Sequence, residues 1–231
     1  MHPDVRNGFA VALERKLGAM SAADLERHVE HYATITALHE AAHAVVHVKS
    51  GVRLVSVDIL PNEHGVGYTL PEEGMTDAQA AVGSFAGCIG EVLTGDIATF
   101  VEATDHDVGQ GVFSCFNLCG GTLGSEVDAE ELMACVMREW DRTVVLIMEP
   151  VTFGGLYKVA GALLANGKLD HEQVEAVMAL VDRPDSNLAK IFRVTKENLA
   201  SVRRMVPLVA GRWLSEDKRR LRDGAFQVET T

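Results

Sequence analysis

The chain reads Leu38-His39-Glu40-Ala41-Ala42-His43-Ala44-Val45 within a segment, Thr36–Lys49, whose residue pattern predicts a helix. A helix places His39 and His43, four residues apart, one turn apart on the same face, so both imidazoles can reach one ion. Glu40 directly follows the first histidine, and its carboxylate can reach a water molecule in an open coordination position. Two histidines and a glutamate at this spacing (HExxH) are typical of zinc peptidases. Because the neighbouring residues are apolar nearly all round, we expect a buried helix.

A zinc site of this kind needs a third protein ligand from elsewhere in the chain. His47 lies eight residues after His39, about 12 Å along a helix axis, too far to share one ion. We therefore expect His47 to pack beside the site or to support its ligands. A third histidine after a glycine turn is excluded, because Val46 and Lys49 occupy those two positions. The remaining candidates are acidic residues further along the chain: Glu91, Asp105 and Asp107.

The pattern around this helix predicts a mainly α protein with a small β element, an α+β class. Capping and breaking residues place the other helices at Asn7–Met20, Ser21–Tyr32, Thr76–Gly95, Val127–Met148, Phe153–Ala165 and Asp170–Leu180. Two short strands, Leu54–Leu60 and Val66–Leu70, are separated by a turn and are expected to form a hairpin. The glycine-rich stretch Asp105–Gly124 has no clear pattern.

Length and charge suggest one acidic body with a basic extension. The chain has 231 residues and a formal net charge of −12, which argues against a nonspecific nucleic-acid binder. From Arg183 onward, however, 11 basic residues outnumber 6 acidic ones. Arg183-Pro184-Asp185 is the best boundary, so we expect a domain over residues 1–182 and a basic helical extension over 183–231. That extension is expected either to be solvated or to dock on the acidic body of a neighbouring subunit or on an ATPase partner.

The sequence favours a cytoplasmic protein that is not inserted in a membrane. Residues 1–10 lack the apolar segment of a secretory signal. The longest uncharged run, Val108–Ser125, is too rich in glycine and polar residues to span a bilayer. The four cysteines contain no CxxC pair, so we expect them to be reduced; they are Cys88, Cys115, Cys119 and Cys135.

The stretch Leu38–Val45 also resembles the metal-binding helix of the FtsH-type peptidase domain, the proteolytic half of membrane-anchored ATP-dependent zinc metalloproteases. Further similar segments follow in the same order, and the whole match spans Ala33 to Asp182. Gly67–Pro71 resembles the strand beside that family's active site, and Ala86–Leu93 its helix of small residues followed by an acid. Ala103–Val108 is similar to the segment that supplies the aspartate ligand. Leu163-Leu164, Lys168-Leu169-Asp170 and Val174 resemble the closing helix pair.

The resemblance implies a zincin-like metallopeptidase helical domain with zinc as its cofactor. It implies that His39 and His43 are the histidine ligands and that Glu40 is the general base. The family's ligand aspartate precedes an aliphatic residue, which favours Asp107 over Asp105 as the third ligand. The strand beside the active site implies substrate contacts at Gly67, Tyr68 and Thr69.

The expected activity is zinc-dependent cleavage of unfolded or extended polypeptides. The chain carries no phosphate-binding loop, so we expect either a separate ATPase partner or a homo-oligomer, and no nucleic-acid partner. The family usually has glycine where this chain has Ala42, and an added methyl group there could narrow the approach to the metal. This departure and the missing ATPase leave a second hypothesis, a catalytically inactive, zinc-stabilised binding or regulatory module.

Overall fold

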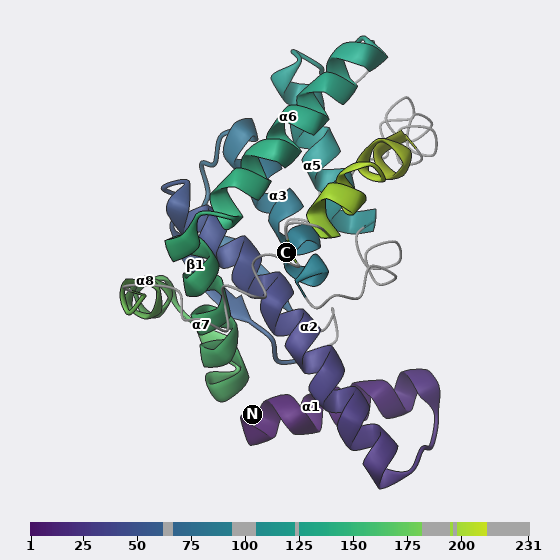
Figure 1. Cartoon of the computed structure of the whole chain (residues 1–231), viewed down its shortest axis with the longest axis vertical. Coiled ribbons are helices and arrows are strands. Elements are labelled where there is room, and N and C mark those ends of the chain that lie inside the picture. Colours follow the sequence, from purple (N-terminus) through teal and green to yellow (C-terminus); the bar gives the residue numbers. More distant parts are fainter. Residues whose placement is uncertain (62–66, 94–104, 123–124, 182–194, 196–197, 212–231) are drawn as a thin grey trace.

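The computed structural model describes residues 1–61, 67–93, 105–122, 125–181, 195 and 198–211 (Figure 1). The protein is mainly helical, with one small antiparallel sheet, which confirms the predicted α+β class. The elements, in chain order, are α1 (Pro3–Leu17), α2 (Ala22–Lys49), β1 (Leu54–Asp58), β2 (Tyr68–Pro71), α3 (Asp77–Val92), α5 (Asp105–Leu118), α6 (Ala129–Ile147), α7 (Pro150–Asn166), β3 (Lys168–Leu169) and α8 (His171–Ala179).

Helix α2 is the central element of the fold. It contacts α1, α3, α6, α7 and α8 as well as β1 and β2, and its second half is buried on nearly every side. In Figure 1, the end of α1 and the beginning of α2 project from the remaining helices, while the first residues of α1 lie beside α7, where the His2 backbone N–H donates to the Leu164 carbonyl at 2.7 Å. The HExxH residues therefore lie on the part of α2 that other elements surround.

The prediction of two helices over residues 21–49 is wrong, because α2 is continuous. Ser21 caps it, accepting a hydrogen bond from the Asp24 backbone nitrogen at 3.2 Å. The β-branched stretch at residues 34–36 does not interrupt the helix, since it contains neither glycine nor proline. Thr34 instead returns its hydroxyl to the Glu30 carbonyl at 2.7 Å, and Ile35 is buried.

Helix α5 lies in the glycine-rich stretch that begins at Asp105 and that shows no clear sequence pattern. Gly111 explains how a helix with poor propensity is accommodated there. A Cβ atom at this position would lie 2.5 Å from Cε1 of Phe85 on α3, so only glycine permits this close approach. Packing against α3 therefore outweighs the intrinsic cost of glycine in a helix. The first turn of α5 carries Asp107.

The sheet has the strand order β2-β1-β3, with both pairs antiparallel. The predicted hairpin between the first two strands is present, although residues 62–66 lie outside the described part. The first strand ends at Asp58, two residues earlier than predicted, because the Asp58 carboxylate accepts the Leu60 backbone N–H at 2.7 Å. Strand β3 has only two residues, too few for a recognisable sequence pattern.

The described part of the basic extension, residue 195 and residues 198–211, packs against the body of the same chain. Five of its apolar residues join the common core: Leu199, Val202, Val206, Val209 and Ala210. Arg203 also forms a two-point ion pair with Asp141 on α6, with nitrogen–oxygen distances of 2.6 and 2.7 Å. The predicted boundary at 182/183 and the terminal cluster Lys218–Arg222 lie outside the described residues. The division into two domains therefore stays a prediction.

Two further features bear on the sequence predictions. All four cysteines are free, and Cys88, Cys115 and Cys135 are buried. Within the ranges that the structure describes, no single helix is long and apolar enough to cross a membrane. Helices α6 and α7, which meet at a 79° bend, reach the required length and apolarity only as a pair.

Candidate metal centre

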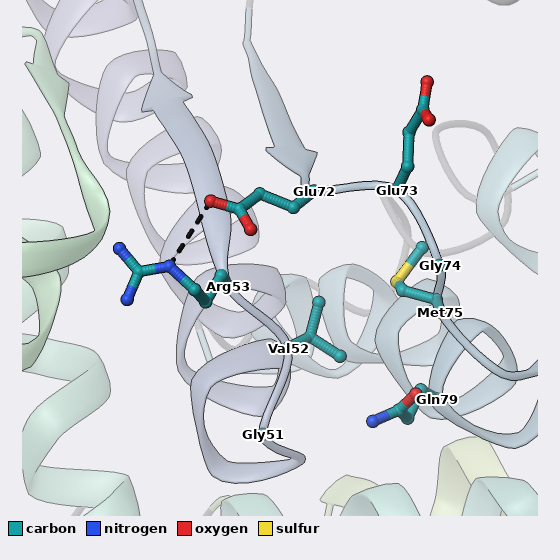
Figure 2. A pocket seen from close by; sticks show the side chains of 8 residues that line it. All are labelled: Gly51, Val52, Arg53, Glu72, Glu73, Gly74, Met75 and Gln79. Carbon is teal, nitrogen blue, oxygen red and sulfur yellow. Dashed lines mark hydrogen bonds and ion pairs between the residues drawn. The ribbon is translucent and has the colours of Figure 1, made fainter.

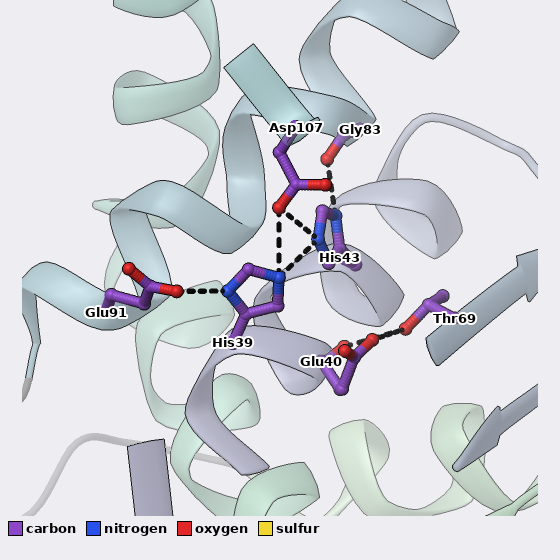
Figure 3. Close-up of polar contacts among 7 residues, drawn as sticks. All are labelled: His39, Glu40, His43, Thr69, Gly83, Glu91 and Asp107. Atoms are coloured by element: carbon purple, nitrogen blue, oxygen red, sulfur yellow. Dashed lines mark hydrogen bonds and ion pairs between the residues drawn. The ribbon is translucent and has the colours of Figure 1, made fainter. Parts of the chain in front are cut away.

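His39, His43 and Asp107 converge where α2 meets the first turn of α5 (Figure 3). The Nε2 atoms of the two histidines lie 3.0 Å apart. Oδ2 of Asp107 lies 3.0 Å from Nε2 of His39 and 3.4 Å from Nε2 of His43. These side chains are only 12% to 17% exposed. Among the described residues, no other group of three or more His, Cys, Asp or Glu side chains is close enough to hold one ion.

Helix α3 holds the outer nitrogen of each imidazole. Nδ1 of His39 lies 2.8 Å from Oε1 of Glu91, and Nδ1 of His43 lies 2.7 Å from the carbonyl oxygen of Gly83. A carbonyl or an ionised carboxylate can only accept a hydrogen bond, so the network assigns the Nδ1 protons to both rings. In the neutral imidazoles, Nε2 then presents a lone pair toward Asp107, as a metal-ligating histidine does.

A glycine on α3 leaves the space that an ion needs. A Cβ atom at Gly87 would lie 2.5 Å from Nε2 of His39 and still closer to Nε2 of His43. Zinc–nitrogen bonds are about 2.0–2.1 Å long. Any side chain at Gly87 would therefore compete with a metal ion for the space beside the two imidazoles. Two nitrogen donors, one carboxylate oxygen and this open space together fit a zinc ion with three protein ligands.

The charges at the site favour a cation. Burial by itself would lower the pKa of His39 and His43, but hydrogen bonds and charge from the neighbouring carboxylates outweigh it and raise both pKa values. Burial by itself would raise the pKa of Asp107, but the two imidazoles outweigh it and hold that pKa well below its usual range. Protons and a metal ion therefore compete for the same donors.

Glu40 lies on the side of the site that faces the sheet (Figure 3). It is 5% exposed, and its Oε2 accepts a hydrogen bond from Oγ1 of Thr69 at 2.8 Å. Burial raises the pKa of Glu40, partly offset by His39, His43 and the Thr69 hydroxyl. The carboxylate is therefore a stronger base than an exposed glutamate.

Of the three residues predicted to contact substrate, two lie at Glu40 and one does not. Thr69 bonds to Glu40, and a Cβ atom at Gly67 would lie 2.9 Å from Oε1 of Glu40. Tyr68 lies between them, and alternation along β2 directs it to the opposite face. Its hydroxyl lies 3.5 Å from Oδ2 of Asp58, away from the two histidines.

Of the two other candidate ligands, the structure describes only the side chain of Glu91. Glu91 holds the outer nitrogen of His39 and does not reach the point shared by the other three donors. The side chain of Asp105 lies outside the described residues.

Ala42 is fully buried between α2 and α3, where a Cβ atom at Gly90 would lie 2.9 Å from its methyl carbon. The Ala42 methyl group therefore lies in a helix contact, not in an open approach to the site.

His47 is a buried packing residue one turn beyond His43. It is 6% exposed, and its Nδ1 has no hydrogen-bond partner among the residues that the structure describes. Its ring fits against Gly83, where a Cβ atom would lie 2.8 Å from Nε2 of His47. Burial, helped by the charge of His43, lowers the pKa of His47 to about 4. The sequence contains Gly83 and Gly87 at helical spacing, but only the crossing of α3 over α2 explains why both must be glycine.

Replacing His47 with glutamine is expected to make folding stability less sensitive to acid. The unfolded chain binds a proton at His47 near pH 6.5, whereas the folded chain does so only near pH 4. The free energy of unfolding of the wild type is therefore unaffected by His47 above pH 6.5. It falls by roughly 3 kcal/mol as the pH drops from 6.5 to 4, because only the unfolded chain then binds a proton at His47. Urea unfolding of the metal-free wild type and H47Q between pH 7 and 4 measures this difference. If the free energy of unfolding changes with pH in the same way in the wild type and H47Q, His47 does not have the lowered pKa.

A cavity lies apart from the candidate metal centre (Figure 2). It has a volume of about 210 Å³ and adjoins the end of α2 and the loop after β2. Arg53 and Glu72 form an ion pair at its edge, with Nε and Oε1 3.3 Å apart. None of its lining residues belongs to the predicted site; they are Gly51, Val52, Arg53, Glu72, Glu73, Gly74, Met75 and Gln79.

Comparison with known proteins finds no family model that matches this chain and no curated protein whose sequence matches it. Function is therefore inferred from the residues of the site and their geometry.

Proposed function

We propose that the protein is a zinc-dependent metalloendopeptidase, built on a zincin-like helical domain, that hydrolyses unfolded or extended polypeptides. The observation that carries the proposal is the convergence of His39, His43 and Asp107, with Glu40 on the adjacent helix position and facing the sheet. Residues distant in the sequence thus meet at the two imidazoles with donor types that suit zinc, and each Nδ1 atom lies against an acceptor, which leaves Nε2 for an ion.

His39 and His43 would hold the ion through Nε2, and Asp107 through a carboxylate oxygen. When bound, zinc supplies Lewis-acid activation of a water molecule and of the peptide carbonyl. Glu91 and the Gly83 carbonyl keep the two imidazoles oriented by accepting their Nδ1 protons. Gly87 adds no side chain that would crowd the two Nε2 atoms from the side of α3.

Glu40 performs the proton transfer in this proposal. Its carboxylate takes a proton from the attacking water and delivers it to the leaving amine. Burial supports that role, because it raises the pKa of Glu40 and so strengthens the base. The position of Glu40 next to His39 in the sequence keeps the base beside the ligands.

Strand β2 supports an extended substrate. It lies at one edge of the sheet and pairs with β1 along one side, and no described strand pairs with its other side. An extended peptide can add to such an edge through backbone hydrogen bonds, which favours unfolded chains over particular side chains. We therefore propose that stably folded proteins resist cleavage unless a separate ATPase partner unfolds them.

The test compares the wild type with Glu40→Gln on unfolded casein. We expect kcat to fall by about 10²- to 10⁴-fold, because the amide cannot accept the proton. Zinc content, measured by elemental analysis, is expected to be unchanged because Glu40 is not a ligand. Glu30→Gln is the matched control, since Glu30 is an exposed glutamate on the same helix.

If the wild type and Glu40→Gln both bind zinc and are equally inactive on casein, the proposal is contradicted. That outcome would favour the second hypothesis, a zinc-stabilised binding or regulatory module. Absence of zinc from purified wild-type protein, even after zinc is supplied, would reject both.

A further inference from the structure

We propose that Thr69 is a positioning residue that divides the roles of the two Glu40 oxygens. Its hydroxyl holds Oε2, so that Oε1 is the atom that exchanges protons with the reacting water. This inference rests on the proposed function, in which Glu40 is the base. It also reassigns Thr69, which the sequence predicted to contact substrate.

The first observation is the hydrogen bond itself. Oγ1 of Thr69 lies 2.8 Å from Oε2 of Glu40 and 3.2 Å from the Glu40 backbone carbonyl oxygen. A hydroxyl has one proton to donate, and the shorter contact leads to the charged acceptor, where a hydrogen bond is stronger. Thr69 therefore donates to Oε2 and fixes the rotation of the carboxylate.

The second observation concerns the other oxygen. Within the described part of the chain, Oε1 of Glu40 accepts no hydrogen bond, although the residue is only 5% exposed. Gly67 borders Oε1, and a Cβ atom there would lie 2.9 Å from it. The glycine thus leaves Oε1 uncovered, while Thr69 occupies Oε2. The strand makes the two oxygens of one carboxylate different.

The third observation is the rigidity of the donor. Thr69 lies in β2, opposite Val57 of β1 in the antiparallel register. A β-branched side chain on a paired strand has few χ1 alternatives, so the hydroxyl stays directed at Glu40. A buried carboxylate without such a donor would lose both stabilisation and orientation.

The experiment compares Thr69→Val, which removes the hydroxyl but keeps the branched shape, with Thr69→Ser, which keeps the hydroxyl. On unfolded casein we expect T69V to lower kcat by about 10- to 100-fold, the size of one hydrogen bond to a charged group. KM and zinc content are expected to stay within about twofold, and T69S is expected to retain most of the kcat of the wild type. Thr34→Val is the matched control, because it makes the same change on the exposed face of α2.

A second readout does not depend on turnover. Infrared difference spectra of the metal-free protein, taken against Glu40→Gln, isolate the carboxylate band of Glu40. We expect the band to shift in T69V and to stay at the wild-type position in T69S. Thermal unfolding of each variant confirms that it is folded before either readout is compared.

The outcomes are distinct. An unshifted band or an unchanged kcat in T69V overturns the inference. A T69S variant as impaired as T69V also overturns it, since the branched shape of the side chain would then matter and its hydroxyl would not. Failure of the proposed function has another signature. The wild type and every variant would be inactive while the band still shifted in T69V, which would overturn the catalytic role and leave only a structural contact.

Discussion

Gly87→Ala is expected to lower the zinc affinity by more than about 100-fold, because the added methyl group lies beside the two ligand nitrogens. A Cβ atom at this position would lie 2.5 Å from Nε2 of His39 and closer still to Nε2 of His43. Neither ring can retreat freely, since Glu91 and the Gly83 carbonyl hold their outer nitrogens. A fluorescent chelator in competition with the protein measures the zinc affinity.

Gly161→Ala on α7 is the matched control for this variant. It makes the same substitution in a helix, but a Cβ atom at Gly161 meets no atom of the described residues within 4 Å. It should keep its zinc affinity and gain about 0.5–1 kcal/mol of stability from the better helix propensity of alanine. Wild-type zinc affinity in G87A would mean that the ion does not bind beside Gly87, and the proposed ligand set would have to be abandoned.

Spacing along one helix predicts the part of the site that is local. His39 and His43 lie together because residues four apart share a helix face, and a glutamate that follows the first of them stays nearby. The third donor depends instead on how α5 crosses α3, which no spacing reveals. Glu91, Asp105 and Asp107 therefore remained alternatives from the residues alone, and only the resemblance favoured Asp107.

The fold class was predictable for a similar reason, while several details were not. Strong apolar periodicity and caps predicted most helices, and the β-branched run at 54–60 predicted a strand. Helix α5 was missed because Gly111 serves close packing against Phe85, a tertiary effect that outweighs local propensity. Strand alternation, by contrast, already implied that Tyr68 and Thr69 point to opposite faces, and it could have separated their roles.

Asp107→Asn is expected to weaken zinc binding by more than about 100-fold, whereas Glu91→Gln is expected to weaken it by about 10- to 100-fold. Asp107 contributes a charged oxygen that lies 3.0 and 3.4 Å from the two Nε2 atoms. The asparagine amide keeps the shape but not the charge, so it is a poorer zinc ligand. Glu91 orients His39 through Nδ1 and is not placed to hold the ion, and glutamine can still accept that proton through its carbonyl oxygen.

Thermal unfolding with and without zinc separates these roles from a general loss of stability. Zinc at 100 times its dissociation constant should stabilise the wild type by about 2.7 kcal/mol, and weaker binding reduces that gain directly. The gain should therefore be largest in the wild type, smaller in E91Q and smallest in D107N. Asp105→Asn completes the comparison, because it removes the neighbouring carboxylate that the sequence left as an alternative. If D105N loses the zinc-dependent gain and D107N keeps it, the third ligand is Asp105 and not Asp107.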